Sequence, residues 1–117
     1  MIQKVLSTLE LHLNKRVAII DFKREFLNTL SLKDIETEDV ISIARSIRGV
    51  DVTLFFKEIG DDHYRVSIRS RGDIGSQEVA KVFKGGGHDH AAGFFYKGKI
   101  EDAKKDILYI IKKQFNK

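Results

Sequence analysis

The 117-residue chain contains no cysteine and no proline. Without cysteine it can form neither a disulfide framework nor a thiolate metal site, which suits a reducing cytoplasm. No segment approaches the ~18 consecutive apolar residues that a membrane-spanning helix needs, and no secretory leader is visible. Proline-rich linkers, low-complexity tracts and internal repeats are also lacking. We therefore expect one cytoplasmic domain that does not enter a membrane.

Side chains that could catalyse a reaction or bind a metal are scarce as well. The chain has four histidines, and no nucleophile stands beside a base. On an extended segment, His88 and His90 would share one face and could form a weak metal site, but no further cluster of ligands lies nearby. His12 and His63 are interpreted as surface residues. We expect no catalytic residue and no metal site in this chain.

The composition is that of a folded domain. Hydrophobic residues make up 42% of the chain and charged residues 32%, and the length suffices for a single core. The formal net charge of +4 and the pI near 9.3 weakly favour an anionic partner.

The first third of the chain predicts two types of element. Apolar residues at helical spacing predict a helix over residues 2–14, and Val17–Phe22 is the continuous apolar run of a strand that is covered on both faces. A short helical piece around residues 26–30 is expected next. Thr37 is then a predicted N-cap of a helix that ends at Gly49. The inward residues of that helix are expected to be Val40, Ile43, Ala44 and Ile47.

Residues 51–58 and 63–70 predict a β-hairpin, because Gly60, Asp61 and Asp62 separate two strand-like runs. In the second strand Tyr64, Val66 and Ile68 face one way. The opposite face then carries Arg65, Ser67 and Arg69, a basic row that is either a solvated surface or a phosphate contact.

The last third of the chain predicts helix, strand and helix. Ser76 is the expected cap of a helix that reaches about Phe83, a strand follows over residues 92–96, and a final helix begins after Gly98. The buried stripe of that helix is expected to contain Ile100, Ala103, Ile107, Ile110 or Ile111, and Phe115. We predict an α/β fold in which helices flank a mixed β-sheet of about four to five strands, with an N-terminal helical extension.

Residues 83–94 form the most unusual segment. Three consecutive glycines cost backbone entropy and are expected only where a side chain cannot be tolerated. Backbone N–H groups in a glycine turn can bind an anion, and His88 would stand at the rim of such a turn. A flexible surface loop is the alternative, but the small and apolar residues 91–95 behind the glycines indicate a buried strand.

Gly85-Gly86-Gly87-His88, two further residues and Ala91-Ala92-Gly93-Phe94 together resemble the signature of the DHH-associated domain, subtype one. This domain is the C-terminal, substrate-binding half of DHH phosphoesterases. The likeness is strongest to the bifunctional oligoribonuclease and PAP phosphatase (nano-RNase) branch, with cyclic-dinucleotide phosphodiesterases as neighbours. A strand that ends in Arg69-Ser70 supports it. The chain departs from the family at Lys84, where a fourth glycine is common, and at His90, where asparagine is common.

The resemblance covers residues 48–117, while residues 1–47 match only loosely and are expected to add a helix, a strand and a connecting helix to the same domain. It implies that the site binds a short oligoribonucleotide, PAP, or a linear or cyclic dinucleotide. Backbone N–H groups, the Arg69 guanidinium and the His88 ring would hold its phosphate. The site residues implied are Arg69, Ser70, Gly85, Gly86, Gly87, His88, His90, Ala91, Ala92 and Gly93, with Arg71 as a helper.

Catalysis, by the same resemblance, belongs to a separate N-terminal DHH domain. That domain carries an Asp-His-His triplet that this chain lacks, and it would hold manganese and hydrolyse the phosphodiester. We expect no cofactor in this chain and no hydrolysis by it alone, although the parent protein would be a metal-dependent phosphoesterase. Whether two copies pair is left open.

Two alternatives remain at this point. Related domains are appended to alanyl-tRNA synthetases, so the chain could be a nucleic-acid-binding or tRNA-editing-associated module. It could also be a helix-mediated interaction domain whose glycine loop is only structural. For a nucleic-acid binder, Tyr96 or Phe95 could supply a stacking platform, with core packing the favoured role of Phe95.

Overall fold

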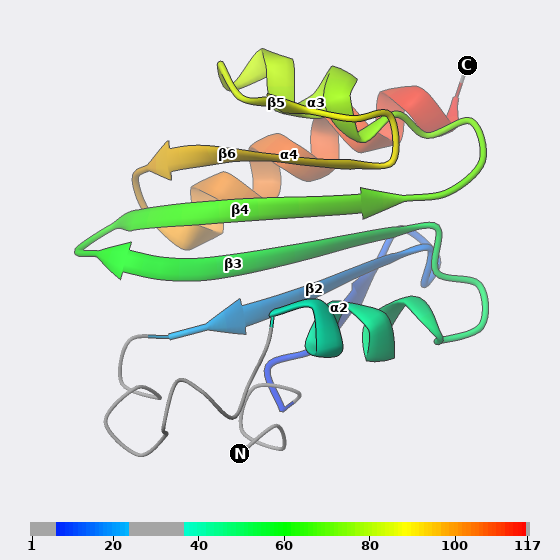
Figure 1. The fold of residues 1–117 in the computed structure, drawn as a ribbon, viewed down its shortest axis with the longest axis horizontal. Helices are drawn as coiled ribbons and strands as arrows, with labels where there is room; N and C mark the ends of the chain where they lie inside the picture. Colours follow the sequence, from blue (N-terminus) through cyan, green and yellow to red (C-terminus); the bar gives the residue numbers. More distant parts are fainter. Residues whose placement is uncertain (1–6, 24–36, 117) are drawn as a thin grey trace.

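The protein is represented by a computed structural model that describes residues 7–23 and 37–116. Its centre is a six-stranded sheet with the order β1-β2-β3-β4-β6-β5 (Figure 1). The strands are β1 (Glu10–His12), β2 (Val17–Phe22), β3 (Val52–Gly60), β4 (His63–Ser70), β5 (Gly86–Gly87) and β6 (Ala91–Lys97). The helices are α2 (Thr37–Arg45), α3 (Ser76–Val82) and α4 (Ile100–Phe115).

The sheet is mixed, as predicted. β2 and β3 are parallel neighbours, whereas the other adjacent strands pair antiparallel. The α/β class is therefore confirmed, but the sheet has six strands rather than four or five because β1 and the very short β5 extend its two edges. None of the helices within the described ranges is long and apolar enough to cross a membrane.

The predicted helix over residues 2–14 is wrong for the residues that the structure describes. Glu10–His12 form β1, and Leu13, Asn14 and Lys15 all have a positive φ, between 52° and 64°, which no right-handed helix allows. Leu9 and Leu13 are four residues apart, so a helix would place them on one face. In the structure they pack against the two cores on opposite sides of the sheet. Residues 1–6 and the predicted helical piece around residues 26–30 lie outside the described residues.

Each face of the sheet buries its own hydrophobic core. Val17 and Ile19 of β2 join the larger core beneath α3 and α4, while Ala18 and Ile20 join the smaller core beneath α2. All six residues of β2 are buried, so the prediction of a strand covered on both faces is confirmed. Figure 1 shows α4 behind the sheet and α2 in front of it.

Helix α2 differs in detail from its prediction. Val40, Ile41 and Ala44 are buried, but Ile43 is 40% exposed, so the predicted inward position of Ile43 is wrong. Residues i, i+1 and i+4 lie close together on a helix, and this set faces the sheet in place of the predicted stripe. The helix ends at Arg45, and Gly49 follows in a turn with φ of 91°.

Helix α3 begins one residue earlier than expected. Its N-cap is Gly75, so the prediction that Ser76 caps this helix is wrong. The side chain of Gln114 on α4 holds Gly75 instead, because it accepts from the Gly75 N–H at 2.8 Å and donates to the Gly75 carbonyl at 3.3 Å. The predicted hairpin of β3 and β4 and the final helix are confirmed, with Ala103, Ile107 and Ile111 buried in α4.

One part of the sheet carries no helix within the described chain. The smaller core beneath α2 draws its sheet residues from β2 and β3, and α3 and α4 cover only the opposite side of β4 and β6. We call the uncovered surface of β4 and β6 the open face. Its residues, in register, are Arg69 beside Ala91, Ser67 beside Gly93, and Arg65 beside Phe95.

Candidate functional site

Two of the three loop glycines are required by close packing against β6. A Cβ atom at Gly85 would lie 2.2 Å from the Gly93 carbonyl oxygen and 2.4 Å from the Phe94 Cβ atom. At Gly87 φ is 147°, and a Cβ atom would lie 2.6 Å from the Ala91 carbonyl oxygen. A side chain at either position would push β5 away from β6, so the packing of these two strands requires glycine at both positions.

Packing does not require glycine at position 86. A Cβ atom at this position would meet no atom within 4 Å, and the residue is exposed. Gly86 is paired with Gly93, so both point to the open face. The middle glycine therefore leaves bare backbone on the outer surface of the sheet.

A pocket of about 650 Å³ lies at the end of the open face, beside the β5–β6 turn. It brings together five of the residues predicted from the sequence, namely Arg69, Gly87, His88, His90 and Ala91. The register explains this convergence, because Arg69 on β4 stands directly beside Ala91, the first residue of β6. The guanidinium of Arg69 donates to the Ile68 carbonyl at 3.2 Å.

Backbone hydrogen bonds hold the turn that carries the two histidines. The His88 N–H donates to the Ala91 carbonyl at 2.8 Å, and the Ser70 N–H donates to the His90 carbonyl at 3.0 Å. The Ser76 N–H donates to the Asp89 carbonyl at 2.6 Å. The ring of His90 donates from Nε2 to the Gly72 carbonyl at 2.9 Å, so this nitrogen helps to anchor the turn. The segment is a built turn and not a loose linker.

Several predicted residues lie behind the pocket rather than in it. The side chain of Ser70 is only 2% exposed, and its hydroxyl shares a 2.7 Å hydrogen bond with that of Ser76. Ala92 is buried in the larger core, and Gly85 packs against Gly93. These residues shape the turn and do not line its pocket.

Arg71 lies at a second pocket, of about 430 Å³, which Arg16 and Asp51 also line. Its side chain donates to the Arg45 carbonyl at the end of α2. Arg71 therefore helps to hold the helix end that carries Arg45.

Sequence reasoning missed three residues that line the first pocket, namely Arg45, Gln77 and Asp89. Arg45 comes from the last turn of α2 and Gln77 from the first turn of α3. The pocket thus holds two arginines and two histidines against the one carboxylate of Asp89, which suits an anionic ligand.

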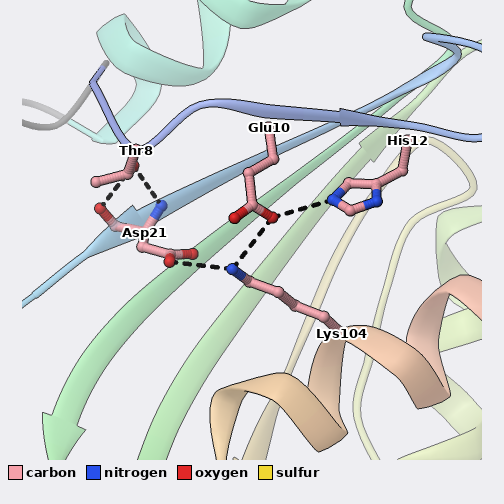
Figure 2. A network of polar contacts seen from close by, with 5 residues as sticks. All are labelled: Thr8, Glu10, His12, Asp21 and Lys104. Carbon is pink, nitrogen blue, oxygen red and sulfur yellow. Dashed lines mark hydrogen bonds and ion pairs between the residues drawn. The ribbon is translucent and has the colours of Figure 1, made fainter.

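A separate polar network ties β1 and β2 to α4 (Figure 2). The Lys104 ammonium donates to Asp21 Oδ2 at 3.2 Å and to Glu10 Oε1 at 3.3 Å, and His12 donates to the same Glu10 oxygen at 3.0 Å. Thr8 exchanges two hydrogen bonds with the backbone of Asp21. Burial raises the pKa of the Asp21 carboxyl despite its Lys104 partner, whereas the hydrogen bond from His12 lowers the pKa of Glu10.

This network does not form a metal centre. Among residues 7–23 and 37–116, no three His, Asp or Glu side chains are arranged to share a metal ion. Lys104 supplies the cation between the two carboxylates. The network fastens the first two strands to the final helix and lies away from the pocket.

Comparison with known proteins identifies relatives of this chain. Residues 25–117 match the DHHA1 domain family. The chain is 38% identical over 89 residues to a probable bifunctional oligoribonuclease and PAP phosphatase NrnA of Streptococcus mutans, an alignment that covers 76% of this chain and 28% of that protein. The chain spans about a quarter of the length of the curated relatives that it matches.

Two solved structures show similar folds. An exopolyphosphatase-related protein from Bacteroides fragilis superposes with a TM-score of 0.77 at 27% identity, covering 96% of this chain and 33% of that one. The C-Ala domain of Aquifex aeolicus alanyl-tRNA synthetase superposes with a TM-score of 0.56 at 21% identity, covering 81% of this chain and 89% of that domain. At this low identity the second likeness concerns the fold alone.

Proposed function

Because the chain belongs to the DHHA1 domain family, whose curated relatives here are bifunctional oligoribonucleases and PAP phosphatases, we propose that it is the substrate-binding part of a DHH-type phosphoesterase. Its ligand would be a short oligoribonucleotide or a phosphorylated nucleotide. The ligand's phosphate would occupy the pocket beside the β5–β6 turn.

The observation that carries this proposal is the meeting of Arg69 with the His88–Ala91 turn. The two motifs are about 20 residues apart in the sequence, and the antiparallel register of β4 and β6 places them side by side. A planar guanidinium binds a phosphate through two parallel hydrogen bonds, and a nearby imidazole can donate a third. Such contacts position a nucleotide chain without reading its bases.

Gly86 and Arg45 complete the proposed phosphate site. The bare backbone at Gly86, next to the pocket, allows an anion to approach closely. Arg45 would supply a second cation for a ligand that carries more than one phosphate, as both PAP and a dinucleotide do.

Hydrolysis is proposed to take place on another domain, where manganese would activate water. The donor set of the described residues does not suit a metal of this kind, because no three ligands converge. This chain's part is to bind the phosphate, orient the strand and present the scissile bond. The likeness to the C-Ala domain, which concerns the fold alone, does not favour the tRNA-associated alternative.

Calorimetric titration of the 5′-phosphorylated diadenylate pApA into the chain tests the proposal. We expect saturable binding that Arg69→Ala weakens. Lys112→Ala removes the same charge from the exposed surface of α4, a helix on the other side of the sheet from the open face, and serves as the matched control. Arg71→Ala separates a direct contact from the supporting position described above. Equal affinities for the wild type, Arg69→Ala and Lys112→Ala would place the ligand elsewhere.

A further inference from the structure

Phe95 has an unusual position for a phenylalanine. Its side chain is 63% exposed, whereas the preceding Phe94 is only 3% exposed. The expectation that Phe95 packs in the core is wrong, because Phe94 and Tyr96 face the helices and strand alternation turns Phe95 outward. Tyr96 packs near Phe83, and its hydroxyl donates to Asp106 at 3.0 Å. Phe95 is thus the large apolar side chain of the open face.

Basic side chains lie on the same face of the sheet as this ring. Arg65 on β4 stands directly beside Phe95, and Lys57 on β3 stands beside Arg65 on the same face. The imidazole of His63, two residues before Arg65 on β4, has its ring centroid 6.3 Å from that of Phe95. An exposed aromatic ring beside arginine and lysine is the combination that binds single-stranded nucleic acid, since the ring stacks on a base and the cations attract the phosphates.

A flat strip joins this ring to the phosphate pocket. Between the Arg69–Ala91 pair and the Arg65–Phe95 pair lies the pair of Ser67 and Gly93. Gly86 extends this small-residue strip onto β5. The two ends are four residues apart along β4, which is about 13 Å at roughly 3.3 Å per residue.

We propose that Phe95 is a base-stacking subsite, at which the base of a second nucleotide of the ligand stacks on the ring. The strand would run along the open face, with one phosphate in the pocket and the base of a neighbouring nucleotide on the Phe95 ring. Arg65 would then lie near the next phosphate. This proposal rests on the proposed function, and it adds a preference for a second base over a bare second phosphate. Stacking on a ring tolerates any base, so little sequence preference is expected.

The surroundings of the ring favour a nucleotide over a protein surface as the occupant. A protein interface buries its aromatic residues within a wider apolar core from which charged residues are depleted. Here the Phe95 ring lies beside Arg65 and near the His63 ring, and Lys57 is the next residue across the sheet; a phosphodiester strand complements the positive charge of Arg65 and Lys57.

Fluorescence offers a direct test, because the chain contains no tryptophan. Phe95→Trp places a single indole at the proposed subsite. Tyr109→Trp is the matched control, since Tyr109 is 61% exposed on α4, on the other side of the sheet. We expect pApA to quench the indole at position 95 and not at position 109. Inorganic phosphate and a dinucleotide that lacks both bases should quench neither.

Affinity measurements give the size of the effect. Phe95→Ala should weaken pApA binding about five- to a hundredfold, while Phe95→Tyr should retain most of the affinity. Binding of the base-free dinucleotide should be the same for the wild type and Phe95→Ala. Because the ring is exposed, circular dichroism should show an unchanged fold.

The outcomes separate this inference from the proposed function. If Arg69→Ala weakens pApA binding but Phe95→Ala does not, the phosphate site stands and the stacking subsite is refuted. If Phe95→Ala weakens the base-free dinucleotide equally, the ring acts on the phosphate site and not on a base, which also refutes the subsite. If the wild type binds neither pApA nor phosphate, both proposals are overturned.

Discussion

The three loop glycines should respond to substitution in different ways, and Gly86→Val is the sharpest case. A Cβ atom at Gly86 would meet nothing within 4 Å, and its φ lies outside the left-handed region. Glycine within a strand costs about 0.5–1 kcal/mol relative to alanine. Gly86→Val should therefore leave the free energy of unfolding unchanged or raise it slightly, with a Tm up to about 5 °C higher.

The same change should weaken ligand binding. The two methyl groups of valine would stand on the open face, where the phosphate is proposed to approach the backbone of β5. The loss of one charge-assisted hydrogen bond, about 1.5–3 kcal/mol, corresponds to at least about a tenfold weaker affinity for pApA. Calorimetry measures this loss, and thermal unfolding followed by circular dichroism measures the Tm.

Gly85→Ala is the contrasting variant. Its Cβ atom would lie 2.2 Å from the Gly93 carbonyl oxygen, so β5 and β6 must separate. Overpacking of this kind costs about 1–3 kcal/mol, and the Tm should fall by about 5 °C or more. If Gly86→Val binds pApA as tightly as the wild type, or if Gly85→Ala is as stable as Gly86→Val, the account of the glycine loop fails.

The remaining predictions concern charge, pH and catalysis. Arg69→Ala should cost about ten- to a hundredfold in pApA affinity at low salt, and the cost should shrink at high salt because an exposed charge contact is screened; an effect that does not change with salt would contradict a screened contact. Burial raises the pKa of Asp21 above its unfolded value, so the contribution of this group to stability is greatest at low pH and falls as the pH rises from about 4. In urea unfolding, Asp21→Asn should therefore become more stable relative to the wild type as the pH rises, and parallel pH profiles would refute this sign. The isolated chain should not hydrolyse pApA or PAP even with manganese; metal-dependent turnover that copurifies with the chain and is lost in His88→Ala would overturn the proposal that catalysis takes place elsewhere.

The strands and the last helix were predictable because their patterns are local. Alternation in residues 63–70 correctly gave the buried Tyr64, Val66 and Ile68, and helical spacing correctly gave the buried Ala103 and Ile107 of α4. The period of the apolar residues within one segment is enough to predict whether it is a strand or a helix and which of its faces is buried.

Other features depended on tertiary contacts that no short segment reveals. The helical spacing of Leu9 and Leu13 was misleading, because the chain reverses at Leu13 and the two side chains enter different cores. Serine is a residue type that often caps helices, but the hydroxyl of Ser76 is hydrogen-bonded to that of Ser70. The side chain of Gln114 binds the backbone of Gly75, which is the N-cap.

The candidate site was predictable only in part for the same reason. Arg69 and the turn that begins at His88 were predicted as partners from their resemblance to known motifs, and the structure places them together. Arg45 joins them through the packing of α2, which no motif near it indicates. The outward direction of Phe95 follows from its register with Arg65, whereas two adjacent phenylalanines in a sequence leave the choice open.

The central claim is that the pocket beside the β5–β6 turn holds the phosphate of a short oligoribonucleotide. Titration of pApA into the ¹⁵N-labelled chain, followed by the amide chemical shifts, tests it most directly. The account predicts saturable shifts at Arg69 and at the loop amides from Gly86 to Ala91, with none around Tyr109 on α4. Shifts that cluster between α3 and α4 while the loop amides remain unchanged would contradict it.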